Sequence, residues 1–441
     1  MRKSTYKFVA GLFAIALLAA GCSSSSDKAS EETAATEESA APAAADPELE
    51  IFTWWAAGGE AAGLAGMQAE FEKNNPDTKY INAAISGGAG VNAKAVLTSR
   101  LDANDPPDSF QAHAGMELDG YVRTGKLEDL TFLYQEEGWD KVFPADLIKT
   151  LTVDGKIYSV PVNIHRANVL WWNPAAAQKA GITAAPKTLD EFFADLDKFK
   201  KSGIDGIALA GKGDWAIAHL LDWVLLATLG ADKFEGLYKG STSWTGPEVA
   251  EGIKNFQKIL SYGNKGAANL DWPDAGKLVT QGKAGFFIMG DWASAQWQSD
   301  GLKLGTDYTW APAPMKDGNV AVYQWLSDSF TLPVGAPHRN GAIAWLKVCG
   351  SKDGQDAFNP KKGSISVRTD SDLSLYDDYL KAAAAQWKTD RLVGSTVHGV
   401  NGNNALMAAY NSAVGKYFSG GAKDNAGLAK GLQAAYDAGK A

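Results

Sequence analysis

Cysteine is scarce in this chain, with only Cys22 and Cys349 among 441 residues. Cys22 lies in a leader segment described below, so Cys349 has no partner and we expect no disulfide bridge. Cys349 ends a stretch of apolar residues at helical spacing, which favours a buried thiol that acts as a small hydrophobic side chain. The protein must therefore be stabilised by its core, and the roughly 390 residues after the leader suffice for two domains of ordinary size.

An excess of positive charge and metal-binding patterns are also lacking. The formal net charge of −9 argues against nucleic acid or an anionic membrane surface as the main partner. None of the five histidines lies in a His-x-x-x-His or paired His/Cys pattern, so we expect no metal and no other cofactor. His113 and His165 are expected to donate hydrogen bonds or to fill structural positions. Gly87-Gly88-Ala89-Gly90 lacks the lysine and hydroxyl residue of a nucleotide loop, which favours a tight turn over a phosphate site.

The first residues have the features of an export signal. Basic residues precede an apolar stretch at 8–20 that is too short to cross a bilayer comfortably and ends at small residues. Ala19-Ala20-Gly21-Cys22 resembles a bacterial lipobox, which implies a signal peptide over 1–21 and a lipid on Cys22 that holds the protein on the outer face of the cytoplasmic membrane. The alternative is an ordinary secreted or periplasmic protein with a spare cysteine. Residues 22–48, rich in Ser, Ala, Glu and Thr, are predicted to form a flexible acidic tether.

Strands and helices alternate after the tether. We expect strands over 49–55, 79–85 and 109–113, with helices over 61–75 and 91–101 between them. This order is typical of a doubly wound α/β sheet. A hairpin at 153–158 and a new strand at 168–172 indicate a crossing into a second lobe near Pro161, and Pro312 indicates the return.

Two adjacent tryptophans end the first expected strand. Successive side chains of a strand point to opposite faces, so if Trp55 is packed inside, Trp54 projects at the carboxyl end of the strand, where open α/β sheets hold their ligands. Glu60 follows in the next loop. A pyranose ring packs its C–H groups on indole while its hydroxyls need acceptors and donors, so this arrangement suits a sugar. Trp272 and Trp292 also lie in connections, although core packing is equally compatible with each of these tryptophans taken alone.

Carboxylates leave a second function open. Glu60, Asp291 and Asp328 include a possible glycosidase pair, in which one group is the acid and the other the base or nucleophile. Nothing in the sequence determines their separation. Asp291 stands at the start of a predicted helix, a position more typical of a cap than of a catalyst. No Gly-x-Ser-x-Gly pattern supports a serine hydrolase.

Several longer motifs occur together in a fixed order. They are Trp54-Trp55, Gly87-Gly88-Ala89-Gly90-Val91-Asn92, Pro106-Pro107-Asp108, Gln111-Ala112-His113-Ala114-Gly115, Val160-Pro161-Val162-Asn163-Ile164-His165-Arg166, Met289-Gly290-Asp291-Trp292 and Asn359-Pro360-Lys361-Lys362-Gly363-Ser364-Ile365. From Leu49 to the C-terminal region the chain closely resembles the glucose-binding proteins of bacterial ABC sugar importers, members of the extracellular solute-binding family that also includes maltodextrin binders.

The resemblance implies a two-lobed α/β fold of the type II periplasmic-binding-protein class. The sugar is expected in the cleft between lobes that close about a hinge near Pro161 and Pro312, with a third crossing near Asn359. The predicted N-terminal lobe comprises 49–161 and 312–358, and the predicted C-terminal lobe comprises 162–311 and 359–441.

The resemblance also implies the residues of the sugar site. Aromatic contacts are expected from Trp54 and Trp55 in the first lobe and from Trp272 and Trp292 in the second. Hydroxyl acceptors are expected at Glu60 and Asp328, polar contacts at Gln111 and His113, and donors from the far side at Lys362 and His398.

The function that follows is that of a lipid-anchored, monomeric binding protein without catalytic activity. It is expected to capture a monosaccharide, glucose, and to deliver it to the permease subunits of an ABC importer. One alternative is a secreted glycoside hydrolase that uses Glu60 and Asp328. Another is a receptor of the same fold for galactose, mannose, xylose or a disaccharide, because single pocket contacts decide between epimers.

Overall fold

The structure, a computed structural model, describes residues 46–318, 321–420 and 424–440. All of them belong to one compact unit of the chain. The predicted signal peptide, nearly all of the predicted tether and Cys22 lie outside the described residues.

Five strands form the first sheet, in the order β2-β1-β3-β13-β6. Their bounds are β1 (Glu48–Thr53), β2 (Lys79–Ala84), β3 (Ser109–His113), β6 (Ser159–Pro161) and β13 (Asp328–Thr331). β1 runs parallel to β2 and β3, which confirms the predicted arrangement of the first three strands, whereas β13 runs antiparallel to β3 and β6.

The first strand ends earlier than predicted, at Thr53. Both tryptophans lie just beyond it because their backbone N–H groups leave the ladder: Trp54 N donates to Gln111 Oε1 at 3.3 Å and Trp55 N to Thr53 Oγ1 at 3.3 Å. The chain then turns, with Ala56 N donating to Trp54 O at 2.9 Å. The tryptophans therefore sit at the carboxyl end of the sheet, in a turn rather than in the strand.

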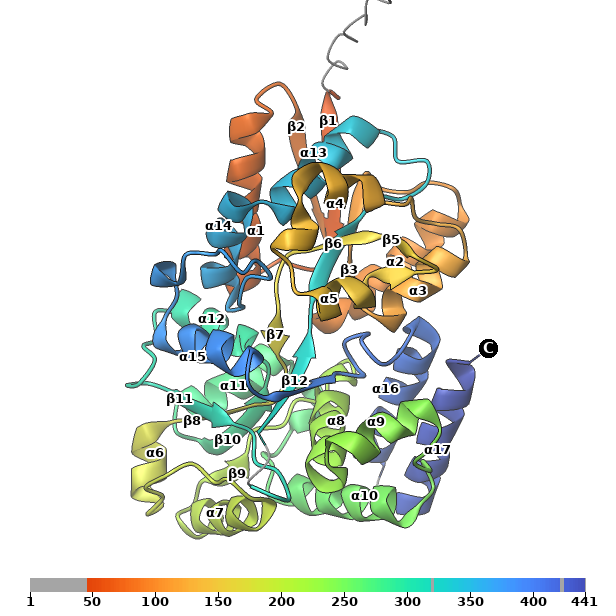
Figure 1. The fold of residues 1–441 in the computed structure, drawn as a ribbon. Helices are drawn as coiled ribbons and strands as arrows, with labels where there is room; N and C mark the ends of the chain where they lie inside the picture. Colours follow the sequence, from red (N-terminus) through yellow and green to blue (C-terminus); the bar gives the residue numbers. More distant parts are fainter. Residues whose placement is uncertain (1–45, 319–320, 421–423, 441) are drawn as a thin grey trace, which may run out of the picture. The chain divides into compact units, whose positions relative to one another are not determined.

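Helices flank the first sheet, with α1 and α14 on one side and α2 and α3 on the other (Figure 1). The helices and short elements of this region are α1 (Gly58–Asn74), η1 (Gly88–Gly90), α2 (Val91–Asp102), α3 (Met116–Arg123), α4 (Thr131–Glu137), η2 (Trp139–Lys141), α5 (Ala145–Thr150), the hairpin of β4 (Thr152–Val153) and β5 (Lys156–Ile157), α13 (Arg339–Gly350) and α14 (Lys352–Lys362). α1 packs mainly on α14 and also on α13.

Four strands form the second sheet, in the order β11-β8-β10-β9. Their bounds are β8 (Val169–Trp172), β9 (Asp205–Ile207), β10 (Ala284–Met289) and β11 (Thr309–Pro312). The surrounding helices are α6 (Pro174–Lys179), α7 (Leu189–Lys201), α8 (Trp215–Leu229), α9 (Ala231–Lys239), α10 (Pro247–Leu260), η3 (Ala267–Asn269), α11 (Trp272–Thr280), α12 (Trp292–Ser299), α16 (Asn404–Ser419) and α17 (Asn425–Ala438).

A third, smaller sheet connects the other two. It has the order β14-β12-β7 and contains β7 (His165–Arg166), β12 (Val322–Leu326) and β14 (Arg391–Gly394), and the chain before β14 forms η4 (Leu373–Leu375) and α15 (Asp378–Trp387). Only Ser327 separates β12 from β13, and 162–164 separate β6 from β7, so the chain passes between the sheets at two adjacent points. Pro312, where we expected a crossing, ends β11 inside the second sheet. The limits of the two lobes stay a prediction.

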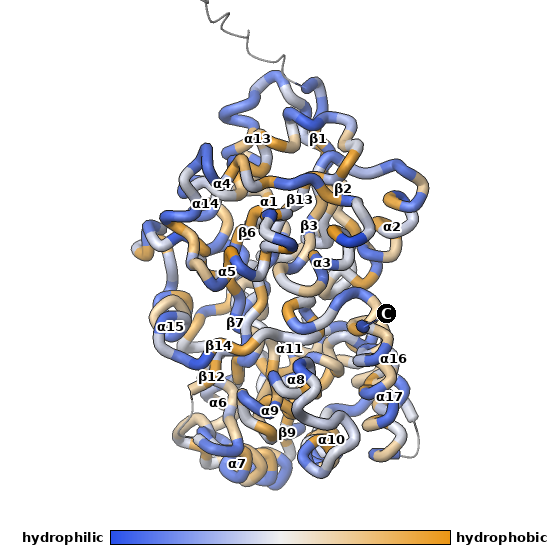
Figure 2. Tube along the Cα trace, turned by 45° about the vertical axis from the view of Figure 1, so that its right-hand side comes forward, coloured by the Kyte–Doolittle hydropathy of each residue, from blue (hydrophilic) through white to orange (hydrophobic). Residues whose placement is uncertain are grey.

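The core is divided between two clusters of buried side chains, one around Trp55 and Trp345 and one around Trp223 and Phe286. Outer helices supply one apolar face each. α7 buries Phe192, Leu196 and Phe199 at helical spacing, and Figure 2 shows polar and hydrophobic residues alternating along it.

Two predictions about the core are confirmed. Trp345 is buried within α13, and Cys349 is a buried free thiol near the end of the same helix. Burial raises the pKa of the Cys349 thiol well above its usual value.

α8 is buried along almost its whole length and is mostly apolar, as expected of a helix in the middle of a protein, although His219 and Asp222 are buried within it. Across the described part of the chain no single helix is long and apolar enough to span a membrane; only the strongly bent pair α8 and α9 reaches that threshold, by length and composition alone.

Candidate functional site

One cavity collects residues from the first and third sheets and from helices beside the second, and its empty space is at most about 360 Å³ including its opening to solvent. Its walls are formed by Trp54, Trp55, Glu60, Gly88, Ala89, His113, His165, Trp215, Trp272, Trp292, Leu326, Asp328, Lys362 and His398. The structure thus brings together every residue predicted for the site except Gln111. Gln111 lies directly behind the wall, where its Nε2 donates to Asp328 Oδ1 at 2.9 Å.

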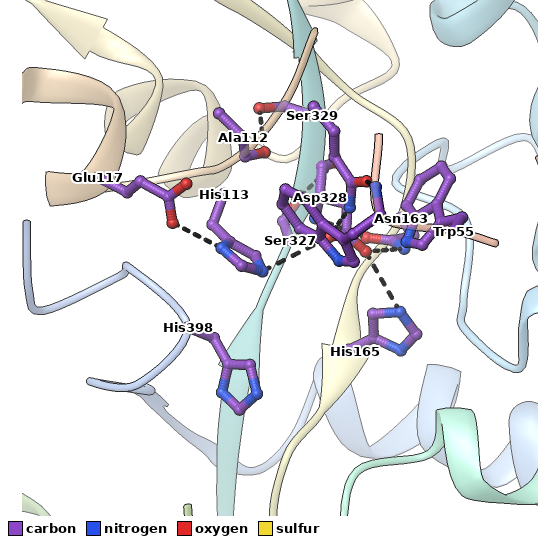
Figure 3. A network of polar contacts seen from close by, with 12 residues as sticks. Trp55, Ala112, His113, Glu117, Asn163, His165, Ser327, Asp328, Ser329 and His398 are labelled. Carbon is purple, nitrogen blue, oxygen red and sulfur yellow. Dashed lines mark hydrogen bonds and ion pairs between the residues drawn. The ribbon is translucent and has the colours of Figure 1, made fainter. Parts of the chain in front are cut away.

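Asp328 is the polar centre of the cavity (Figure 3). Its Oδ1 accepts from Gln111, and its Oδ2 accepts from Asn163 Nδ2 at 2.8 Å. Nε2 of His113 lies 3.6 Å from Oδ1, and Nε2 of His165 lies 3.4 Å from Oδ2. Burial alone would raise the pKa of Asp328, but His165, Lys362 and His113 outweigh it and hold that pKa well below the usual range. Asp328 is therefore an anion at neutral pH.

Two further carboxylates orient the histidines beside Asp328. Nδ1 of His113 lies 2.6 Å from Glu117 Oε2, an oxygen that also accepts from Lys94 Nζ at 2.8 Å. Nδ1 of His165 contacts Asp291 Oδ1 in the same way. Each carboxylate fixes one ring nitrogen and so turns the other, Nε2, toward Asp328.

The predicted helix cap at Asp291 is wrong. Asp291 precedes α12, but its side chain makes no capping hydrogen bond. Its two oxygens are used by His165 Nδ1 and by Arg166 N, which donates to Oδ2 at 2.9 Å. Contacts with the connecting strand β7, which sequence spacing does not reveal, replace the cap.

Indoles supply most of the apolar wall. Trp54 packs beside His113 at 5.1 Å between ring centroids, and Trp55 lies between Phe358 and Phe330 at 4.8 and 5.6 Å. Both line the cavity although both are buried, whereas the strand argument, which assumed that both lie in β1, separated them onto opposite faces. Its indole Nε1 has no partner among the described residues.

Trp215 was missed by the sequence analysis. It opens α8, and its ring lies 6.5 Å from that of Trp292, which opens α12. A signal was present, because Gly-Asp-Trp occurs twice, at 213–215 and at 290–292. Lys94 was also missed, and no local pattern marks it.

Glu60 and Lys362 form an ion pair in the wall, with Lys362 Nζ 3.1 Å from Glu60 Oε1. Glu60 lies in the first turn of α1 and Lys362 in the last turn of α14, positions at which helix dipoles favour these charges. Lys362 Nζ also lies 5.6 Å from the Trp55 ring and 5.9 Å from the Trp292 ring. The predicted lobe limits place Lys362 in the second lobe, whereas α14 packs on α1.

The loop at 87–90 forms the predicted tight turn, and Gly88 and Ala89 reach the cavity wall. A Cβ on Gly88 would lie 2.2 Å from Trp215 Nε1, and one on Gly90, whose φ is +75°, would lie 2.7 Å from the Trp54 ring. These glycines allow the backbone to approach the two indoles.

The chemistry of the walls suits binding better than proton transfer. Glycoside hydrolysis requires a carboxylic acid with a raised pKa, whereas the pKa of Asp328 is depressed and both its oxygens are hydrogen-bonded. No cluster of His, Cys, Asp and Glu that could hold a metal ion is found within 46–318, 321–420 and 424–440.

Comparisons with known proteins agree with this geometry. The profile of the family described as "Bacterial extracellular solute-binding protein" matches residues 55–356. An uncharacterized ABC transporter extracellular-binding protein of Pyrococcus horikoshii is 35% identical, over 83% of this chain and 82% of the relative. A probable sugar-binding periplasmic protein of Mesorhizobium japonicum is 32% identical, over 86% of this chain and 90% of the relative. The xylose/arabinose-binding protein XacG of Haloferax volcanii is 30% identical, over 85% and 82%.

Solved structures show the same fold. The bacterial solute receptor AcbH, described as having an exclusive substrate preference for β-D-galactopyranose, aligns with a TM-score of 0.78 at 17% identity, over 89% of this chain and 98% of its own. A chitin oligosaccharide binding protein aligns with a TM-score of 0.78 at 20% identity, over 89% and 99%.

The fold and the enclosed cavity define a two-lobed binding protein of the type II periplasmic class. The chain belongs to the bacterial extracellular solute-binding protein family. It is the sugar-binding component of an ABC transporter, with permease subunits as partners, and it acts in the extracellular or periplasmic space. The family consists of binding proteins rather than enzymes, so the hydrolase alternative is not supported.

Proposed function

We propose that the cavity binds a single sugar ring, that of glucose, and that the protein delivers it to the permease. The observation that carries this proposal is the joint presence of five indoles and several charged hydrogen-bonding groups around one cavity. These groups lie around one small cavity, which supports a ligand of a single ring.

The proposed contacts are those predicted from the sequence: Trp54, Trp55, Glu60, Gln111, His113, Trp272, Trp292, Asp328, Lys362 and His398. Each hydroxyl of a sugar can both donate and accept a hydrogen bond. A neutral sugar therefore needs donors and acceptors in the site, and the ligand itself brings no net charge. Lys362 and the unpartnered Trp55 Nε1 supply donors, while Glu60 and Asp328 supply acceptors. Hydrogen bonds to charged groups are the stronger ones, and the indoles cover the apolar faces of the ring.

Calorimetric titration with glucose, galactose, mannose, xylose, arabinose and maltose tests the proposal. We expect glucose to bind most tightly. We expect Trp54→Ala and Asp328→Ala to weaken binding by roughly 10- to 100-fold, because each removes a buried contact of about 1.5–3 kcal/mol. Trp310→Ala is the matched control, since Trp310 packs on Tyr379 at 4.8 Å and is absent from the cavity wall.

The outcomes separate the alternatives. Unchanged affinity in Trp54→Ala or Asp328→Ala would remove that residue from the site. Tighter binding of xylose, arabinose or galactose would replace glucose by the kind of ligand for which XacG and AcbH are named. Hydrolysis of aryl glycosides would instead support the glycoside hydrolase alternative.

We further propose that the protein is a monomer, held on the membrane by a lipid on Cys22, with the two lobes closing on the sugar. The support for the anchor is the lipobox-like sequence at 19–22. We expect Cys22→Ser to release the protein into the medium or to leave an unprocessed precursor. Cell fractionation and immunoblotting measure this, and a normally processed, membrane-held variant would contradict the anchor.

A further inference from the structure

Asp222 is a buried carboxylate behind the cavity wall, on α8. Its Oδ2 accepts three hydrogen bonds: from Ser395 Oγ at 3.0 Å, from Thr396 N at 2.9 Å and from Gln324 Nε2 at 2.9 Å. Two of these donors belong to the segment after β14 that carries His398. Asp222 therefore anchors the loop that brings His398 to the cavity.

Ser395 links Asp222 to His398. Its Oγ lies 2.9 Å from His398 Nδ1 as well as 3.0 Å from Asp222 Oδ2. A hydroxyl has one proton, and an ionised carboxylate can only accept, so the Ser395 proton points at Asp222. Toward His398 the same oxygen must then accept, which places a proton on Nδ1.

His398 carries only this one ring proton. Burial lowers the pKa of His398 well below its usual value, and His219, His113 and Lys94 lower it further. With the proton on Nδ1, Nε2 is left with a free lone pair. This nitrogen is buried and has no partner among the described residues, and His398 lines the cavity, with its ring 5.9 Å from that of His113 (Figure 3).

We propose that Asp222, acting through Ser395, holds His398 in the Nδ1–H tautomer, so that His398 Nε2 accepts a hydrogen bond from a hydroxyl of the ligand. This rests on the proposed function, because it takes the ligand to be a sugar. The role is the reverse of the donor role that the family resemblance implies for His398. Asp222 and Ser395 are positioning residues, since neither lines the cavity.

The tautomer itself can be measured without any sugar. Histidine labelled with ¹⁵N in the full chain reports which ring nitrogen carries the proton, and loss of the signal in His398→Gln assigns it. We expect a protonated Nδ1 and an unprotonated Nε2 in the unliganded protein at pH 7.5. A protonated Nε2 would overturn the proposal. Because no ligand is present, failure of this inference is distinguishable from failure of the sugar site.

Ser395→Ala tests the relay. Without the hydroxyl, Nδ1 loses its acceptor, and we expect the ring proton to redistribute to Nε2 and glucose affinity to fall about tenfold. Ser109→Ala is the matched control, because it removes another buried serine hydroxyl, which donates to Thr331 O at 2.6 Å away from the cavity. The control should keep both the tautomer and the affinity. A wild-type ¹⁵N pattern with wild-type affinity in Ser395→Ala would refute the relay.

Acidification gives a readout that does not depend on the folding of Ser395→Ala. Burial raises the pKa of Asp222 to about 6, against hydrogen bonds from Thr396 and Ser395. Protonated Asp222 can donate to Ser395 Oγ, which frees the serine proton for His398 Nδ1 and moves the ring proton to Nε2. We therefore expect the ¹⁵N signals of His398 to exchange identity between pH 7.5 and 5.

The groups around Asp222 stay neutral over this pH range. Burial raises the pKa of Tyr238 and Tyr410 well above 10 and lowers that of His219, one turn away on α8, to about 4. Asp222→Asn keeps an acceptor for Ser395 but cannot titrate, so its His398 signals should not exchange between pH 7.5 and 5. An exchange that persists in Asp222→Asn, or that is absent from the wild type, would contradict the assignment to Asp222.

Discussion

Glu117 is a fully buried carboxylate that orients a residue of the cavity without lining the cavity itself. It contacts His113 Nδ1 at 2.6 Å and accepts from Lys94 Nζ at 2.8 Å. Burial alone would raise the pKa of Glu117, but Lys94 and His113 outweigh it and lower the pKa to about 2. The carboxylate is thus stabilised in its charged form by the two partners that it holds in place.

The depressed pKa of Glu117 makes the stability of the protein depend on pH. A carboxyl whose pKa is lower in the folded than in the unfolded state stabilises the fold above its unfolded value, and this stabilisation is lost as pH falls through the folded value. The contribution is therefore present above about 4.5 and is lost toward about 2. A shift of this size corresponds to roughly 3 kcal/mol. Glu117→Gln should destabilise the protein at pH 7 and flatten its stability curve between pH 4.5 and 2.

Urea denaturation at a series of pH values measures this effect. Glu248→Gln is the control, because the ion pair of Glu248 with Lys233 is exposed, and such pairs contribute little. If the free energy of unfolding of Glu117→Gln equalled that of the wild type at pH 7 as well as at pH 2, the buried pair would have no net stabilising role.

Most residues that the sequence analysis assigned to the site lie around one cavity in the structure, and their role in sugar binding stays a prediction. Trp54 follows β1, Glu60 lies in the first turn of α1 and Asp328 begins β13, and all three line the cavity. Lys94 and Glu117 could not be found in this way, because their meeting depends on how α2 packs beside α3 and β3. Asp222 was hidden for the same reason, because its partners Gln324, Ser395 and Thr396 are distant in sequence and its flanking residues Leu221 and Trp223 are apolar.

At the scale of elements, the close contact of α1 and α14 is what places Lys362 beside Glu60. Glycines on α1 make this approach possible. A Cβ on Gly66 would lie only 2.5 Å from Ala357 O, a backbone atom of α14, and one on Gly63 would lie 3.0 Å from the Phe358 ring. The two helices therefore pack backbone against backbone along this face.

Gly66→Ala should push α14 away from α1. Overpacking of this kind costs about 1–3 kcal/mol, more than the roughly 1 kcal/mol that alanine gains in helix propensity. We expect a lower melting temperature and weaker glucose binding, because Lys362 at the end of α14 moves with the helix. Gly120→Ala in α3 is the control: nothing lies within 4 Å of its Cβ, so it should be neutral or slightly stabilising. Equal stability of the two variants would show that α14 adapts without strain.

Elements were predictable where hydrophobic periodicity is local. The first three strands and the helices between them follow from alternation and from breakers such as Pro76. The passage between the sheets at Ser327 was not predicted, because β12 and β13 are both buried and only one residue marks the change of sheet. Pairing partners far away in the sequence decide where one strand ends and the next begins.

At the scale of the whole molecule, local patterns predicted an α/β protein, while the two-lobed arrangement came from the family resemblance. The structure adds a contact between helices that flank different sheets. α12, which follows the second sheet, packs on α1 of the first, and a Cβ on Gly59 would lie 2.5 Å from Ala295 Cβ. A Cβ on Gly363, after α14, would lie 2.8 Å from the same atom. Ala295 thus lies where α12 meets the start of α1 and the end of α14.

Ala295→Leu should act as a wedge that hinders closure. If sugar binding is coupled to closure, the wedge removes contacts that only the closed form makes, and glucose affinity should fall by roughly tenfold or more while the unliganded protein keeps its melting temperature. In small-angle X-ray scattering the wild type should become more compact with saturating glucose, and Ala295→Leu should not. Ser299→Leu, an exposed position on the same helix, should behave like the wild type. Compaction and affinity equal to the wild type in Ala295→Leu would mean that α12 does not approach α1 when the sugar binds.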